Sequence, residues 1–234
     1  MRKVLILAAL ATATAITAGT LYGVRGEGEQ RKLIEGVAYT MWDDSARDWV
    51  GWADQISIVK VNSEEQLPIS EQVESTGEGF VGRRIVATVE ATLWARDSSS
   101  WTPDGTPTVS STVSLKTTDG WWMKDGRLVP YRDVATHRAE LGDRLLVAIF
   151  KSEGYGWTMM SAGVPLNSDV VAPPAAGERR PDVAVAGRSI AELARALSSA
   201  RPLPEVAKHY ALAPDARMRA VWEDGRAARD SAGG

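Results

Sequence analysis

Few of the side chains that usually carry catalysis or bind metals occur in this sequence. It has two histidines, His137 and His209, and no cysteine. Neither histidine has a carboxylate or a second histidine at the spacing of metal ligands. Adjacent acids occur at Asp43–Asp44, Glu64–Glu65 and Glu223–Asp224, where paired carboxylates are usually solvated. We therefore predict no metal site and no cofactor.

Two segments match the sequence patterns of known catalytic or nucleotide-binding sites but fall in a different secondary structure. Ser57 and Lys60 have the serine–lysine spacing of penicillin-binding enzymes, but Ser57 falls within an expected strand rather than at the start of a helix. The Gly77-x-Gly79-x-x-Gly82 fingerprint precedes a strand rather than a helix. No Gly-x-Ser-x-Gly motif is present. A Ser-His-Asp triad is still possible, because its three residues need not be close in sequence. We predict no catalytic residue and consider an enzyme less favoured than a binding protein.

Tryptophan is unusually frequent, with nine residues against two phenylalanines. Trp42, Trp49 and Trp52 have helical spacing and are expected in the core. Three others fall in expected loops, where an exposed indole is costly unless it binds something. We predict that these three bind a ligand, with sugar rings of the cell envelope as first candidate and a protein as second: Trp101, Trp121 and Trp122. The alternative is that Trp121 or Trp122 plugs the end of a barrel.

Residues 1–24 have the pattern of an export segment. Arg2 and Lys3 precede an uncharged stretch from Val4 to Val24, and two Ala-x-Ala motifs within it are candidate cleavage sites. At about 1.5 Å per residue the stretch would also just cross a hydrocarbon core about 30 Å thick. A cleaved signal peptide and a retained membrane anchor both stay open. Both predict that the rest of the chain is extracytoplasmic.

Alternation of apolar and polar residues predicts a mainly β chain. The expected strands cover residues 55–61, 83–96, 112–116, 127–131, 144–151 and 157–161. Residues 62–82 are polar and expected to form a loop, and Asp119-Gly120 and Asp125-Gly126 indicate turns. Asp54 is expected to bind backbone N–H groups where a helical pattern at 32–54 meets the first strand.

The last part of the chain changes to helical periodicity. Ser189-x-x-Glu192 is a capping box, and Pro204 and Pro214 suit the first turns of two further helices. A helical turn is expected within 133–141, and the tail after Gly225 is expected to fray. The predicted fold is a small closed barrel like that of oligonucleotide/oligosaccharide-binding (OB) domains, with an N-terminal helix as signal or anchor and short C-terminal helices. Its expected parts are the barrel domain with its preceding helix (25–170), a linker (171–187) and a helical segment (188–234).

Three segments resemble netrin-like domains, the family that includes the tissue inhibitors of metalloproteinases and exported bacterial proteins. They are Trp52–Val61, with its Ala-Asp pair before an apolar strand, Val86–Trp94, and Glu140–Val147. The resemblance covers about half of the chain and implies an OB barrel. The animal inhibitors bind the protease zinc through an N-terminal cysteine, which this chain lacks, so inhibitory activity does not carry over.

Composition narrows the functional classes. A net charge of −3 argues against a nucleic-acid binder held by phosphate contacts. The favoured hypothesis is an extracytoplasmic, non-enzymatic module that binds a protein or an envelope glycan, with membrane attachment through the N-terminus if it is uncleaved. One alternative is a hydrolase with carboxylates converging on a cleft. Another is a structural component of a membrane complex, which an exposed apolar face on the C-terminal helices would favour.

Overall fold

The computed structural model describes residues 45–97, 105–131, 137–173 and 185–232. The expected export segment, Trp42 and Trp101 lie outside these residues. No helix in the described ranges is long and apolar enough to cross a membrane.

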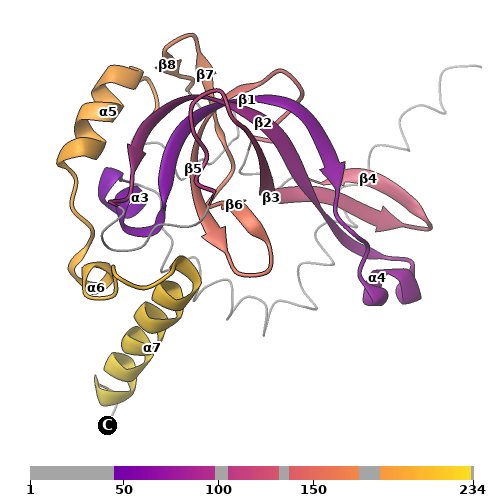
Figure 1. Ribbon diagram of the computed structural model, residues 1–234. Helices are drawn as coiled ribbons and strands as arrows, with labels where there is room; N and C mark the ends of the chain where they lie inside the picture. Colours follow the sequence, from indigo (N-terminus) through magenta and orange to yellow (C-terminus); the bar gives the residue numbers. More distant parts are fainter. Residues whose placement is uncertain (1–44, 98–104, 132–136, 174–184, 233–234) are drawn as a thin grey trace, which may run out of the picture. The chain divides into compact units, whose positions relative to one another are not determined.

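Five strands close a barrel (Figure 1). In chain order they are β1 (Gln55–Gln66), β2 (Gly79–Ala95), β3 (Thr112–Lys124), β5 (Arg144–Ser152) and β6 (Gly156–Met159). β1 pairs antiparallel with β2 along one edge and with β5 along the other. β2 pairs with β3, and β5 with β6, again antiparallel. The ring closes where β3 and β6 pair in parallel, at Lys116 and Thr158.

The remaining strands and one short helix attach to this ring. α4 (Glu71–Thr76) lies between β1 and β2, and β4 (Arg127–Tyr131) pairs with β3. β7 (Val164–Asn167) pairs with the start of β5 and with β8 (Val170–Val171).

Alternation along the strands separates an apolar interior from a solvated outer face. Ile85, Ala87 and Val89 of β2 are buried, as the sequence predicts, and they pack with Val113 and Leu115 of β3. Because side chains alternate between the two faces of a strand, the intervening residues point outward. The outward rungs of the β2–β3 ladder are Thr88 with Thr112, Val86 with Ser114, and Arg84 with Lys116.

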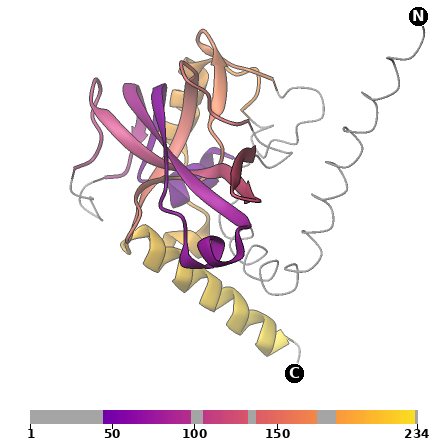
Figure 2. The same cartoon turned by 90° about the vertical axis from the view of Figure 1, so that its right-hand side faces the viewer.

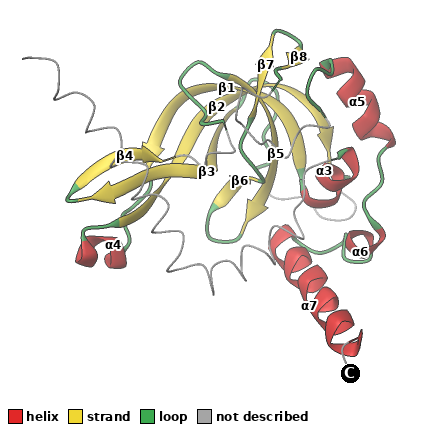
Figure 3. Ribbon diagram, turned by 180° about the vertical axis from the view of Figure 1, so that it is seen from behind, coloured by secondary structure: helices red, strands yellow, loops and turns green. Residues whose placement is uncertain are grey.

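A second apolar cluster lies outside the barrel, where helices cover β1 and β5 (Figure 3). The helices are α3 (Ala46–Trp52), α5 (Ile190–Ser199) and α6 (Pro204–Ala207). α5 begins with the predicted capping box at Ser189 and Glu192. Its Leu193 and Leu197 are buried in the cluster together with Trp49 and Trp52 of α3. β5 is therefore apolar on both faces because it contacts the barrel interior on one and this cluster on the other.

A buried charge cluster joins the last helix, α7 (Pro214–Ala232), to the barrel, below which it lies in Figure 2. Asp54 accepts a hydrogen bond at 3.0 Å from Arg96 Nε and another at 3.0 Å from the Lys151 backbone N–H. Arg217 of α7 lies 3.9 Å from the same carboxylate, and the Tyr210 ring packs against both guanidinium groups. Burial lowers the pKa of Arg217 to about 9 and raises the pKa of Asp54. One carboxylate thus balances two buried cations.

Besides adding β7 and β8, which the sequence did not predict, the structure differs from the prediction in four places. The expected loop at 62–82 is ordered: β1 extends to Gln66, α4 follows, and β2 begins at Gly79, because the polar end of β1 still pairs with β2. β3 continues through Asp119-Gly120, with a register shift against β2 but no turn, since Asp119 binds Arg83. Residues 137–141, the described part of the expected helical turn, are not helical. The tail does not fray at Gly225, because α7 continues to Ala232.

We predict that Asp54→Asn lowers the free energy of unfolding by about 3–5 kcal/mol, because it leaves two buried guanidinium groups without a counter-charge. The matched control is Asp169→Asn. Asp169 also pairs with an arginine, but its side chain is 80% exposed, so the expected loss is about 1 kcal/mol or less. Urea unfolding of both variants checks this, and equal losses would contradict the role given to Asp54.

Candidate functional site: an aromatic and cationic pocket on the outer face of β3

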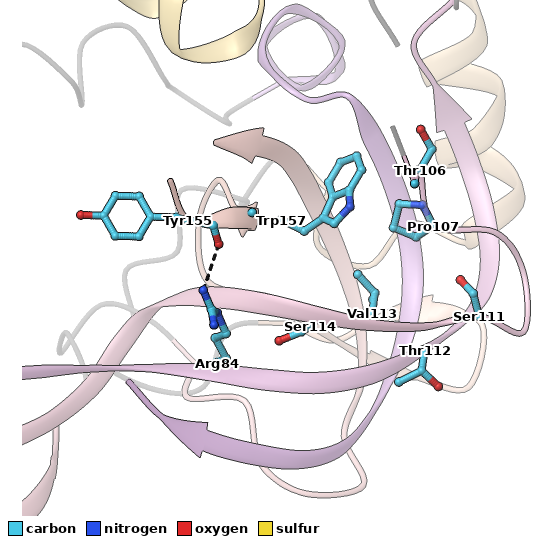
Figure 4. A pocket seen from close by; sticks show the side chains of 11 residues that line it. Arg84, Thr106, Pro107, Ser111, Thr112, Val113, Ser114, Tyr155 and Trp157 are labelled. Atoms are coloured by element: carbon cyan, nitrogen blue, oxygen red, sulfur yellow. Dashed lines mark hydrogen bonds between the residues drawn. The ribbon is translucent and has the colours of Figure 1, made fainter. Parts of the chain in front are cut away.

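A pocket of about 400 Å³ lies over the start of β3 (Figure 4). Its lining includes Arg84 and Ser114 from the outer face of the β2–β3 ladder, and also Val113 and Trp157, which pack with the barrel interior. Three segments form its walls: Arg84 of β2, residues 111–114 of β3, and residues 155–157 of the β5–β6 turn and β6. Gly105, Thr106 and Pro107 of the β2–β3 connection close one side. In Figure 4 the Trp157 indole points toward Thr106 and Pro107, whereas the Tyr155 ring points away from them.

The β5–β6 turn presents Tyr155 to solvent. Gly154 and Gly156 on either side of it have φ angles of 79° and 74°, a left-handed backbone that glycine adopts without strain. Asp215 at the start of α7 fixes the same turn, since its carboxylate accepts hydrogen bonds from the Ser152 hydroxyl and the Glu153 backbone N–H. The Tyr155 side chain remains 53% exposed.

Two cations surround Tyr155. Arg84 donates a hydrogen bond of 3.2 Å to the Tyr155 carbonyl oxygen, and Lys116 Nζ lies 3.3 Å from the centroid of the Tyr155 ring. Burial lowers the pKa of Lys116, and the Arg84 charge lowers it further. In the ranges that the structure describes, no carboxylate lies within ion-pair distance of either cation, although Glu65 faces Arg84 across the β1–β2 ladder. The site therefore combines aromatic rings, hydroxyl groups and unbalanced positive charge.

Beyond the barrel, β2 and β3 continue with β4 as a three-stranded extension, called here the arm (residues 79–82, 120–124 and 127–131). It lies on the side of the barrel away from α5, as Figures 1 and 3 both show. The buried Arg83 side chain lies at its base. Arg83 donates hydrogen bonds of 2.6 and 2.9 Å to Asp119 and also pairs with Glu64. This ion cluster joins β1, β2 and β3 where the apolar interior ends.

The outer face of the arm carries an aromatic cluster. The ring of Tyr131 lies 5.6 Å from that of Phe80, edge to face, and 6.1 Å from that of Trp122. Phe80 and Tyr131 are 43% and 42% exposed. Gly120 makes room for the cluster, because a Cβ there would lie 2.9 Å from the Phe80 ring and 2.2 Å from the Val81 carbonyl oxygen.

The structure separates the predicted binding tryptophans. Trp121 and Trp122 are neighbours on β3, so their side chains lie on opposite faces of the arm. Trp122 joins the aromatic cluster. The Arg138 guanidinium lies over the Trp121 ring, with its Cζ 5.4 Å from the ring centroid. Trp101 lies outside the described residues.

The pocket residues Arg84, Lys116 and Tyr155 did not stand out in the sequence. The only signal was the Gly-Tyr-Gly turn at 154–156, which predicts an exposed tyrosine but no partner for it.

The residues considered for catalysis lie elsewhere and apart from one another. His137 Nε2 lies 2.8 Å from an Asp143 carboxylate oxygen, and His209 Nε2 lies 2.8 Å from that of Asp224. In the described part of the chain, no three histidine or acidic side chains gather as metal ligands do. Asp54 binds a backbone N–H as expected, but the N–H belongs to Lys151 of β5 rather than to a helix.

Comparisons with protein-family models, with curated proteins and with solved structures find no match to this chain. The resemblance to netrin-like domains therefore stays a prediction.

We predict that Arg84→Gln raises the pKa of Lys116, because it removes a like charge while Lys116 stays buried. NMR titration of the Lys116 side chain in the full chain measures the shift. Arg127→Gln, which removes an exposed cation at the tip of the arm, serves as control and is expected to leave the Lys116 pKa unchanged. An unchanged Lys116 pKa in the Arg84 variant would contradict the coupling of the two cations.

Proposed function

We propose that this protein is an extracytoplasmic, non-enzymatic binding module whose ligand is a glycan of the cell envelope, bound in the pocket over β3. The observation that carries the proposal is the pocket lining. Tyr155 and Trp157 offer aromatic surface, while Thr112, Ser114 and Arg84 offer hydrogen-bonding groups. Ligand sites combine apolar and aromatic surface with a few well-placed polar groups in this way. A sugar ring has complementary chemistry, with C–H faces for the aromatic rings and hydroxyl groups for the polar ones.

The strand order supports the proposal through the fold. We infer that the barrel is an OB barrel, because its ring order β1-β2-β3-β6-β5 contains one parallel pair, β3 with β6, among antiparallel pairs. OB barrels bind oligosaccharides and oligonucleotides on the face of their second and third strands and with the loop between the fourth and fifth. The counterparts here are the β2–β3 face and the β5–β6 turn, which are two of the walls of the pocket. An OB barrel is also what the netrin-like resemblance implies.

The extracytoplasmic location rests on the export pattern of residues 1–24. The glycan is preferred to a nucleic acid because the chain has a net charge of −3.

The packing of the C-terminal helices argues against the structural alternative. That alternative needs an exposed apolar face on these helices, but Leu193, Leu197 and Val206 are each 1–2% exposed and belong to the cluster shared with α3 and β5.

We predict that Tyr155→Ala weakens binding to purified cell-wall glycan strands by roughly tenfold or more, the effect of removing a central aromatic contact. Intrinsic tryptophan fluorescence of the full chain follows the titration, since Trp157 lines the pocket. The matched control is Leu141→Ala, which removes an even more exposed apolar side chain (76%) before β5. Absence of saturable binding by the native protein would refute the proposed function. Equal affinity of Tyr155→Ala and native protein would refute the assignment of the pocket.

A further inference from the structure

The pocket is one end of a longer surface. The residues of β2 at positions 80, 82, 84, 86 and 88 share one face of the strand, and they pair with positions 122, 120, 116, 114 and 112 of β3. The outer face of this ladder therefore runs from the hydroxyl groups at Thr112 and Ser114, past Arg84 and Lys116, to the aromatic cluster of the arm, with one register shift between Arg84 and Gly82.

Positive charge occurs at two places along this face. Arg84 and Lys116 form the first pair beside Tyr155, and Lys124 and Arg127 form the second at the tip of the arm, where they pair across the β3–β4 ladder. Lys124 and Arg127 are exposed, and no carboxylate of the described residues lies within ion-pair distance of them, although Asp125 follows in the turn. At about 3.3 Å per residue, the stretch of β3 from Lys116 to Lys124 spans at most about 26 Å.

Aromatic surface fills the interval between the two cation pairs. Gly82 faces Gly120 next to the first pair, and without side chains there the Phe80 ring lies against Gly120. Tyr131 pairs with Gly120, and Trp122, which pairs with Phe80, lies one rung nearer the tip. Val129, 55% exposed, pairs with Trp122 and adds aliphatic surface.

We propose that the ligand is an acidic glycan chain that lies along this outer face, with sugar rings on Tyr155 and on the Phe80–Trp122–Tyr131 cluster and carboxylate groups against the two cation pairs. This proposal rests on the proposed function and adds to it the charge of the ligand and its path over the arm. An isolated sugar would need only the pocket, whereas a repeated arrangement of cations and rings suits a polymer with repeated charge. Binding an anion beside Lys116 and Arg84 would also relieve their mutual repulsion.

The decisive experiment compares two probes that differ in charge and by one methyl group at each carboxylate. They are purified cell-wall glycan strands with free carboxylates and the same strands after methyl esterification of those carboxylates. The native full chain is expected to bind the acidic strands roughly tenfold more tightly, with an affinity that falls as salt is raised. Two double variants test the two cation pairs, and each is expected to remove most of this preference while retaining binding to the ester. The first combines Arg84→Gln with Lys116→Gln, and the second combines Lys124→Gln with Arg127→Gln.

Neighbouring tryptophans provide the matched test of the path. Trp122→Ala is expected to weaken binding of the acidic strands roughly tenfold, whereas Trp121→Ala, on the opposite face, is expected to leave the affinity unchanged. Urea unfolding of both variants measures how far each change destabilises the fold. If Trp122→Ala proves too unstable, Lys124→Gln with Arg127→Gln tests the arm with exposed residues alone.

Each other outcome overturns a defined part of the proposal. Equal affinity for acidic and esterified strands would overturn the inference and leave the proposed function standing. Binding of neither probe would refute the proposed function and the inference with it. Tighter binding of an oligothymidylate than of the acidic strands would assign the face to nucleic acid instead.

Discussion

The pairing of β1 along both of its edges is the constraint on which the rest of the structure depends. Because β1 pairs with β2 and with β5, the sheet closes on itself and needs a fully apolar interior. The helices α3, α5 and α6 then cover the outside of β5 and of the first half of β1, which leaves these stretches without a solvated face, whereas β1 is exposed at Lys60 and from Asn62 to Gln66. The outer face of β2 before Ala91 and the outer faces of β3 and β6 remain accessible on the ring, together with the end of β1. The location of the proposed binding surface thus follows from the way the barrel is closed.

Buried ion clusters fix the parts that the apolar core does not reach. At one end of the interior, Arg83 with Asp119 and Glu64 holds the base of the arm. Asp54 with Arg96 and Arg217 attaches α7, whose Asp215 in turn holds the turn that carries Tyr155. Each cluster contains a side chain that would be costly to bury alone, so each orients two or three segments at once. These clusters therefore place the two ends of the proposed binding surface.

Local pattern predicted the strands of the barrel and the starts of α5, α6 and α7, but not β7, β8 or α4, nor what the polar residues do. Period-two alternation identified the buried face of β2, and the Ser189–Glu192 box identified the start of α5, because both are set by neighbours in sequence. Asp119-Gly120 looked like a turn because its partner, Arg83, is far away in the chain. Lys116 and Tyr155 come together only through the parallel pairing of β3 with β6, which no local sequence pattern predicts. Trp121 and Trp122 were treated as one pair although adjacent strand residues face opposite ways.

The central claim is that a glycan binds on the outer face of β2, β3 and β6, and amide chemical-shift mapping tests it most directly. The full chain, labelled with ¹⁵N, is titrated with purified cell-wall glycan strands. If the glycan binds there, shift changes are expected to concentrate at Arg84, residues 111–116 and residues 155–158, with little change in α3 and α5. Changes concentrated on the α3–α5 side of the barrel, or no changes at saturating glycan, would contradict it.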